Sequence, residues 1–154
     1  MSFKNSKKAI AMMYVESNLG DILLMKEMLK RSDLPFHLTV VRDGEKAIQM
    51  LKTADPFAEH EIPDLILLDL HLPRLSGLEI LATIRKMERY ENLPVVIMGP
   101  TKKDRDIQAA YANQADLFLV KPTDLEHLGV VLRQIEAFCL SHYSHSKPQA
   151  KKVV

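Results

Sequence analysis

The sequence has 154 residues, of which 47% are hydrophobic and 27% charged, a size and composition that fit one domain with a buried core. Lysine and arginine number 21 against 20 acidic residues, for a net charge of +1, which argues against a nucleic-acid or membrane-surface binder. The single cysteine, Cys139, excludes an intramolecular disulfide and fits a reducing compartment. No apolar run is long enough to span a bilayer, and the N-terminus lacks the apolar core of a secretory signal. We therefore expect a cytoplasmic protein.

The hydrophobic pattern predicts five strands, each followed by a helix. In chain order, the strands are expected at about residues 8–15, 36–42, 63–69, 94–98 and 116–120, and the helices at about 19–31, 44–53, 78–89, 103–113 and 124–140. The third strand has a nearly unbroken apolar centre, which is typical of a parallel strand covered on both faces. Five such units with short connections predict an α/β fold, a doubly wound five-stranded parallel sheet with helices on both faces.

One domain is expected over residues 8–140. An N-terminal tail over residues 1–7 would precede it. A polar, basic and disordered C-terminal tail would follow over residues 141–154.

In such a sheet, functional groups gather at the carboxyl ends of the strands. In chain order, those ends carry Glu16 and Ser17, then Asp69, Gly99 and Lys121. Two carboxylates and one ammonium should therefore converge from distant parts of the sequence. Clustered carboxylates suit a divalent cation, and a lysine across the pocket can bind an incoming anion. This combination predicts chemistry on a phosphoryl group.

The segment PDLILLDLHLP at residues 63–73, followed by Gly77 and by the Lys-Pro pair at 121–122, resembles the receiver domain of response regulators. The resemblance to this CheY-like family of two-component signalling covers nearly the whole chain. It implies the flavodoxin-like receiver fold, structural roles for Pro73 and Gly77, and a signalling protein that is not an enzyme. The segment IEAFCLSH in the last helix resembles small stand-alone regulators paired with bacterial phytochrome kinases.

The resemblance also implies a role for each matched residue. Asp69 would be the phosphoacceptor that takes a phosphoryl group from a phosphohistidine. Lys121 would contact the phosphoryl oxygens, and Pro122 would match the cis-proline that follows this lysine. Mg²⁺ would be held by Glu16, Asp69 and the backbone carbonyl of His71.

Two positions depart from the family pattern. Ser17 stands where the family has a second acidic ligand, which weakens the Mg²⁺ site because an opposite charge contributes on the order of 1–4 kcal/mol. Gly99 stands where the family has the hydroxyl that draws the switch aromatic, here Phe118, inward. Thr101 would replace this hydroxyl only if Pro100 bends the chain toward the site. Losing a hydrogen bond to a charged group, worth roughly 1.5–3 kcal/mol, affects switching more than phosphorylation.

Two functions of different classes follow from these residues. In the first, a single-domain response regulator accepts a phosphoryl group on Asp69 from a sensor histidine kinase or phosphotransfer protein and signals through protein contacts. The alternative is a pseudo-receiver, a binding module independent of phosphorylation because of Ser17 and Gly99. An aspartate-nucleophile phosphatase is rejected, because its Asp-x-Asp motif would need an acid at His71. The apolar face of the last helix could support a homodimer, although most of its side chains are needed to pack against the sheet: Leu125, Leu128, Val131, Leu132, Ile135 and Phe138.

Overall fold

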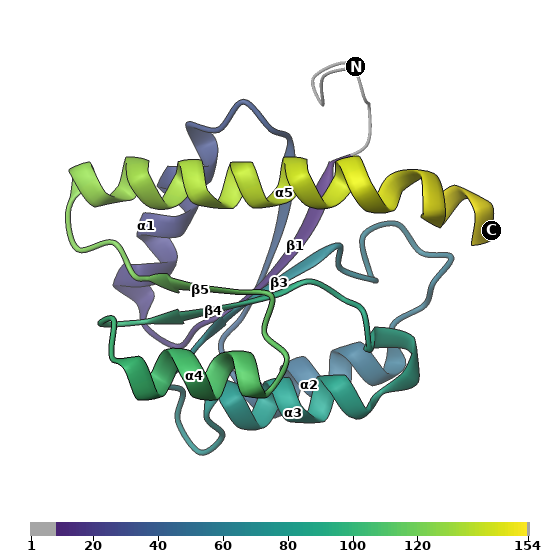
Figure 1. The fold of residues 1–154 in the computed structure, drawn as a ribbon, viewed down its shortest axis with the longest axis horizontal. Helices are drawn as coiled ribbons and strands as arrows, with labels where there is room; N and C mark the ends of the chain where they lie inside the picture. Colours follow the sequence, from purple (N-terminus) through teal and green to yellow (C-terminus); the bar gives the residue numbers. More distant parts are fainter. Residues whose placement is uncertain (1–8, 154) are drawn as a thin grey trace.

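The computed structural model in Figure 1 describes residues 9–153, with side chains as far as residue 142. The strands are β1 (Ile10–Val15), β2 (Phe36–Val41), β3 (Leu65–Asp69), β4 (Val95–Gly99) and β5 (Leu117–Val120). They form one parallel sheet in the order β2-β1-β3-β4-β5. The helices are α1 (Leu19–Lys30), α2 (Gly44–Thr53), α3 (Gly77–Lys86), the 3₁₀ helix η2 (Glu88–Tyr90), α4 (Asp104–Ala112) and α5 (Leu125–Val153). The predicted doubly wound sheet is confirmed.

Helices cover both faces of this sheet: α1 and α5 lie on one face, and α2, α3 and α4 on the other (Figure 1). Every residue of β1, β3 and β4 is buried, as expected for parallel strands covered on both sides. Met25 and Met28 of α1 lie in the core beneath α5. Ile80 and Ile84 of α3 lie in the core on the opposite face. The two cores fix the strands, and with them the edge at which the strands end.

Two helices end more than two residues away from their predicted ends. α3 ends at Lys86, and η2 follows it because Tyr90 is buried and its hydroxyl donates a 2.6 Å hydrogen bond to the carbonyl of Leu51. α5 runs to Val153 rather than ending near residue 140. No glycine occurs after Gly129, so the usual signal that ends a helix is missing.

The predicted domain boundaries stay predictions. The tail expected over residues 1–7 and the side chains from residue 143 onward lie outside the described residues. Although α5 has 29 residues, no described helix has a stretch apolar enough to cross a membrane.

Candidate functional site

The carboxyl ends of β1, β3 and β5 bring three predicted site residues together. The Nζ atom of Lys121 lies 2.6 Å from Oε1 of Glu16 and 3.1 Å from Oδ1 of Asp69. Among the described residues, Glu16 and Asp69 are the buried polar or charged ones, with 0% and 4% of their surface exposed. Burying charged groups is costly unless they are paired. The ammonium of Lys121 supplies that pairing for both carboxylates.

A third carboxylate, that of Asp21, also contacts this ammonium. Its Oδ2 atom lies 2.8 Å from Nζ of Lys121. Asn18 brings Asp21 to the site by capping α1, because its side-chain oxygen accepts a 2.9 Å hydrogen bond from the backbone N–H of Asp21. The sequence analysis missed Asp21. The available signal was an acid in the first turn of the helix that starts directly after β1.

Glu16 is held by hydrogen bonds to both of its carboxylate oxygens. The hydroxyl of Tyr14 donates to Oε1 at 3.1 Å, and the backbone N–H of Asn18 donates to Oε2 at 3.2 Å. Burial raises the pKa of the Tyr14 hydroxyl, and the neighbouring Glu16 carboxylate raises it further. Tyr14 therefore keeps its proton and remains a donor to Glu16.

The pKa of Asp69 is raised from its ordinary value of 3.8 to about 7. Burial is the main cause, the adjacent Glu16 adds to it, and the Lys121 ammonium opposes both. Burial lowers the pKa of Lys121, but its three carboxylate partners outweigh this effect and raise the pKa overall. The site therefore pairs a permanent ammonium with an aspartate that titrates near neutral pH, an arrangement common at functional sites.

The loop after β3 places its predicted residues around Asp69. The backbone N–H of His71 donates a 3.3 Å hydrogen bond to Oδ1 of Asp69, while the His71 side chain is exposed. Gly77 starts α3, and its N–H donates to the carbonyl of Leu70 at 2.9 Å. A Cβ atom added to Gly77 would collide with the backbone carbonyl of Asp69. Only glycine allows this close approach. The side chain of Pro73, also in this loop, is exposed.

The expectation of a cis-proline is wrong. The described residues contain no cis peptide bond, so the bond between Lys121 and Pro122 is trans. The trans form is favoured by about 0.5–1 kcal/mol before proline, and the lysine reaches all three carboxylates with it.

At the position of the missing hydroxyl, the ring of Phe118 packs against Gly99. A Cβ atom on Gly99 would lie only 2.7 Å from Cζ of Phe118 and 3.4 Å from Cδ2 of Leu70. Phe118 is half-buried and packs against the core beneath α2, α3 and α4. Thr101 is exposed, so it does not replace the hydroxyl. The aromatic ring takes the space that a side chain on β4 would need.

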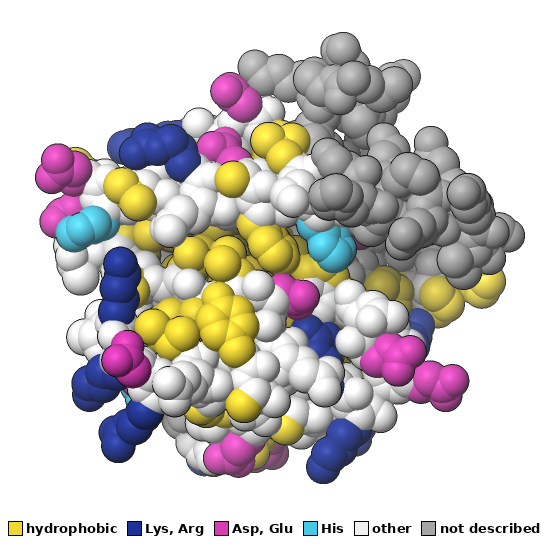
Figure 2. Space-filling model, viewed as in Figure 1, with side chains coloured by type: hydrophobic (Ala, Val, Ile, Leu, Met, Phe, Trp, Pro, Cys, Tyr) yellow, Lys and Arg dark blue, Asp and Glu magenta, His cyan; other side chains and the backbone are white. Residues whose placement is uncertain are grey.

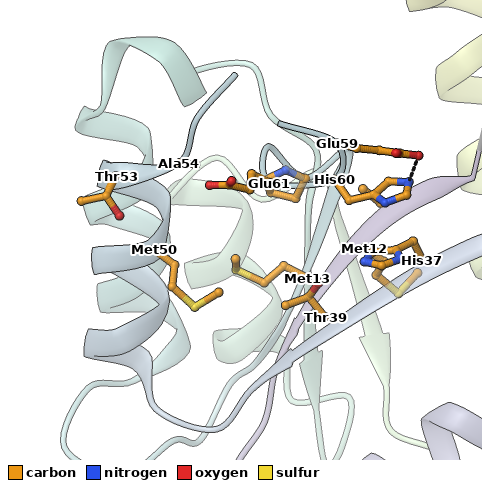
Figure 3. Close-up of a pocket in the computed structure, with 12 residues that line it drawn as sticks. Met12, Met13, His37, Thr39, Met50, Thr53, Ala54, Glu59, His60 and Glu61 are labelled. Atoms are coloured by element: carbon orange, nitrogen blue, oxygen red, sulfur yellow. Dashed lines mark ion pairs between the residues drawn. The ribbon is translucent and has the colours of Figure 1, made fainter. Parts of the chain in front are cut away.

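A cavity of about 330 Å³ lies away from this site (Figure 3). Residues from the amino-terminal half of β1 and of β2 line it, among them Ala11 and His37, which pair across the two strands. The rings of His37 and His60 stack there with their centroids 4.0 Å apart. None of the predicted site residues lines this cavity.

The donors at the carboxyl edge suit a hard divalent cation. Glu16 and Asp69 offer buried carboxylate oxygens, the ligand type that Mg²⁺ and Mn²⁺ prefer. In the part of the chain that the structure describes, no group of three or more acidic, histidine or cysteine side chains is arranged to hold a metal ion.

A parallel sheet in this strand order, with acids facing a lysine across its carboxyl edge, defines a receiver-type signalling domain. The family model described as the response regulator receiver domain matches residues 13–133, so the chain belongs to that family. It is a response regulator of two-component phosphorelay signalling.

Known relatives also include phytochrome-associated regulators. The chain is 33% identical over 126 residues to the response regulator Rcp1 of Synechocystis sp., a match that covers 82% of this chain and 86% of Rcp1. The phosphorylated cyanobacterial phytochrome response regulator RcpA superposes with a TM-score of 0.76 at 34% identity, covering 87% of this chain and 96% of RcpA. The Mn²⁺-bound form of Rcp1 superposes with a TM-score of 0.72 at 32% identity, covering 84% of this chain and 93% of Rcp1. The resemblance predicted from the sequence is confirmed.

Proposed function

We propose that Asp69 accepts a phosphoryl group from a sensor histidine kinase or a phosphotransfer protein. The observation that carries the proposal is the buried Asp69 carboxylate 3.1 Å from the Lys121 ammonium. A carboxylate oxygen of Asp69 attacks phosphorus, the P–N bond to the histidine breaks, and the imidazole leaves with the electron pair. The acyl phosphate keeps its charged oxygens near Lys121, which stabilises them by charge-assisted hydrogen bonds.

A Mg²⁺ ion fits the same edge, held by Glu16, Asp69 and the backbone carbonyl of His71. When bound, it would neutralise charge on the phosphoryl oxygens as the group is transferred. Ser17 supplies no charge, so we expect weaker binding than in a site with an acid there. The similarity to a regulator whose structure is described as Mn²⁺-bound supports this assignment.

The surface over α4, β5 and α5 is the proposed output face, which would contact a downstream protein or a second copy of the chain. Figure 2 shows hydrophobic side chains gathered over these elements. Tyr111, Leu125 and Val130 are among the exposed large ones, and the Tyr111 hydroxyl accepts a 3.2 Å hydrogen bond from the Phe118 N–H. This bond ties α4 to β5.

The apolar face of α5 that could support a homodimer mostly packs against the sheet, as expected from the sequence. Four of its six residues lie in the core and are not available to a partner: Leu128, Val131, Leu132 and Ile135. Leu125 is exposed and Phe138 is partly buried. A homodimer would therefore use Leu125 together with Tyr111 and Val130.

With protein contacts as its output, the protein acts as a cytoplasmic signalling module rather than as an enzyme that turns over a separate substrate.

The second candidate function is the pseudo-receiver, and one observation favours it. Phe118 fills the space beside Gly99 that a side chain on β4 would need. In this case the output face would keep one conformation, and partners would bind it whether or not Asp69 is phosphorylated.

The mass of the intact protein tests the first function. After incubation with Mg²⁺ and acetyl phosphate, we expect the chain to gain the mass of one phosphoryl group, and the Asp69→Asn variant to gain none. The Asp104→Asn variant, which alters an exposed aspartate of α4, should gain it as the unaltered chain does. No gain in the unaltered chain, either with acetyl phosphate or with a phosphorylated kinase, would contradict the proposal and favour the pseudo-receiver.

A further inference from the structure

The Lys121 ammonium has three carboxylate partners that differ in position and burial. Glu16 and Asp69 lie at the strand ends and are 0% and 5% exposed at the side chain, while Asp21 on α1 is 30% exposed. The distances to Nζ are 2.6 Å for Glu16, 2.8 Å for Asp21 and 3.1 Å for Asp69. Asp21 thus holds the ammonium more closely than Asp69 does.

Asp21 restores the number of acids at this edge. With Ser17 uncharged, only Glu16 and Asp69 would face Lys121 from the strand ends. Asp21 follows Ser17 by four residues, and the Asn18 cap places it at the same edge. Three carboxylates therefore surround one ammonium, which leaves excess negative charge for a divalent cation to neutralise.

Asp21 also affects which oxygens a cation can reach. Lys121 occupies oxygens of Glu16 and Asp69 that a cation would need, so the ammonium and the cation compete for them. When the oxygens of Glu16 and Asp69 bind a cation, Asp21 still provides the ammonium with a partner on α1. Removing the Asp21 charge would both weaken the attraction for the cation and strengthen this competition.

We propose that Asp21 stands in for the acid missing at position 17: it positions the Lys121 ammonium and supplies the charge that allows a divalent cation to bind beside Asp69. The inference rests on the proposed phosphoacceptor function. It assigns Asp21 as a positioning residue, without requiring that it ligate the cation.

Calorimetric titration of the full chain with Mn²⁺ tests the inference. We expect the dissociation constant to rise about tenfold in Asp21→Asn, since one close charge is lost, and to change less than threefold in Asp21→Glu, which keeps the charge. Ser17→Asp combined with Asp21→Asn should restore binding to within about threefold of the unaltered chain. The matched control is Glu27→Gln, an exposed acid on the same helix that pairs with Lys30 and Arg31; it should leave binding unchanged.

Two results would overturn the inference alone: equal Mn²⁺ binding by Asp21→Asn and the unaltered chain, or no recovery when the acid is placed at position 17. Absence of Mn²⁺ binding by the unaltered chain would overturn both the inference and the metal site of the proposed function. The backbone N–H of residue 21 still binds Asn18 in Asp21→Asn, and circular dichroism would establish that the variant is folded.

Discussion

Replacing Lys121 with methionine is expected to lower the free energy of unfolding by about 3–5 kcal/mol at pH 8. Methionine keeps an unbranched apolar side chain, so the main loss is the ammonium. Glu16 and Asp69 are then buried without the cation that lies 2.6 Å and 3.1 Å from them, and a buried charge without a partner is strongly destabilising. Urea unfolding followed by circular dichroism measures the loss.

The size of this loss should depend on pH. The pKa of Asp69 is about 7 in the folded protein against an ordinary 3.8, so the folded state binds more protons than the unfolded state between these values. The contribution of Asp69 to stability therefore falls as the pH rises from about 4 to about 7. Lys121 opposes the upward shift. Without Lys121 the pKa of Asp69 rises further, so stability continues to fall as the pH rises above 7.

The loss of unfolding free energy in Lys121→Met should accordingly be greatest at pH 8. It should shrink toward pH 5, where Asp69 is protonated in the folded variant. Lys46→Met, which alters an exposed lysine of α2, should change stability by less than about 0.5 kcal/mol at either pH. An equal deficit for Lys121→Met at pH 5 and pH 8 would show that lost packing, not the unpaired carboxylates, causes it.

The fold could be predicted because the apolar runs and the alternation of strands and helices point to the same sheet. The apolar run at residues 65–69 is a buried central strand, and the alternation of strands and helices allows few topologies. Glu16, Asp69 and Lys121 could be placed together for the same reason, since parallel strands end at a common edge. The geometry of the backbone alone settles these features.

The remaining features depend on side-chain directions, which the pattern does not contain. Asp21 lies 100 residues from Lys121, and the two side chains meet because α1 begins at the sheet edge where β5 ends. Leu128 and Ile135 share the apolar face of α5 with the exposed Leu125, but they are buried in the core. A helical stripe shows which residues share a face, not how deeply that face is covered.

Replacing Gly99 with threonine, which would add the missing hydroxyl, is expected to displace the ring of Phe118. The new Cβ atom would lie 2.7 Å from Cζ of that ring, closer than van der Waals contact allows, while the β-branched side chain itself suits a strand. We expect the ring to move outward and the free energy of unfolding to fall by about 1–3 kcal/mol. Fluorine NMR of 4-fluorophenylalanine-labelled protein, with Phe118 assigned by a Phe118→Leu variant, would detect the movement.

A double-mutant cycle with Phe118→Ala gives the control for this displacement. Because the two side chains compete for one space, Gly99→Thr should cost less stability when the ring is absent, and the two effects should not add. Additive effects and an unmoved fluorine signal would contradict the packing described for Gly99 and Phe118.

The fluorine signal of Phe118 also separates the two candidate functions. If the ring is fixed by the absence of a β4 side chain, phosphorylation of the unaltered chain leaves its signal in place. In Gly99→Thr, the hydroxyl can bind the phosphoryl group, so phosphorylation changes the side chain that contacts the ring and should shift the signal.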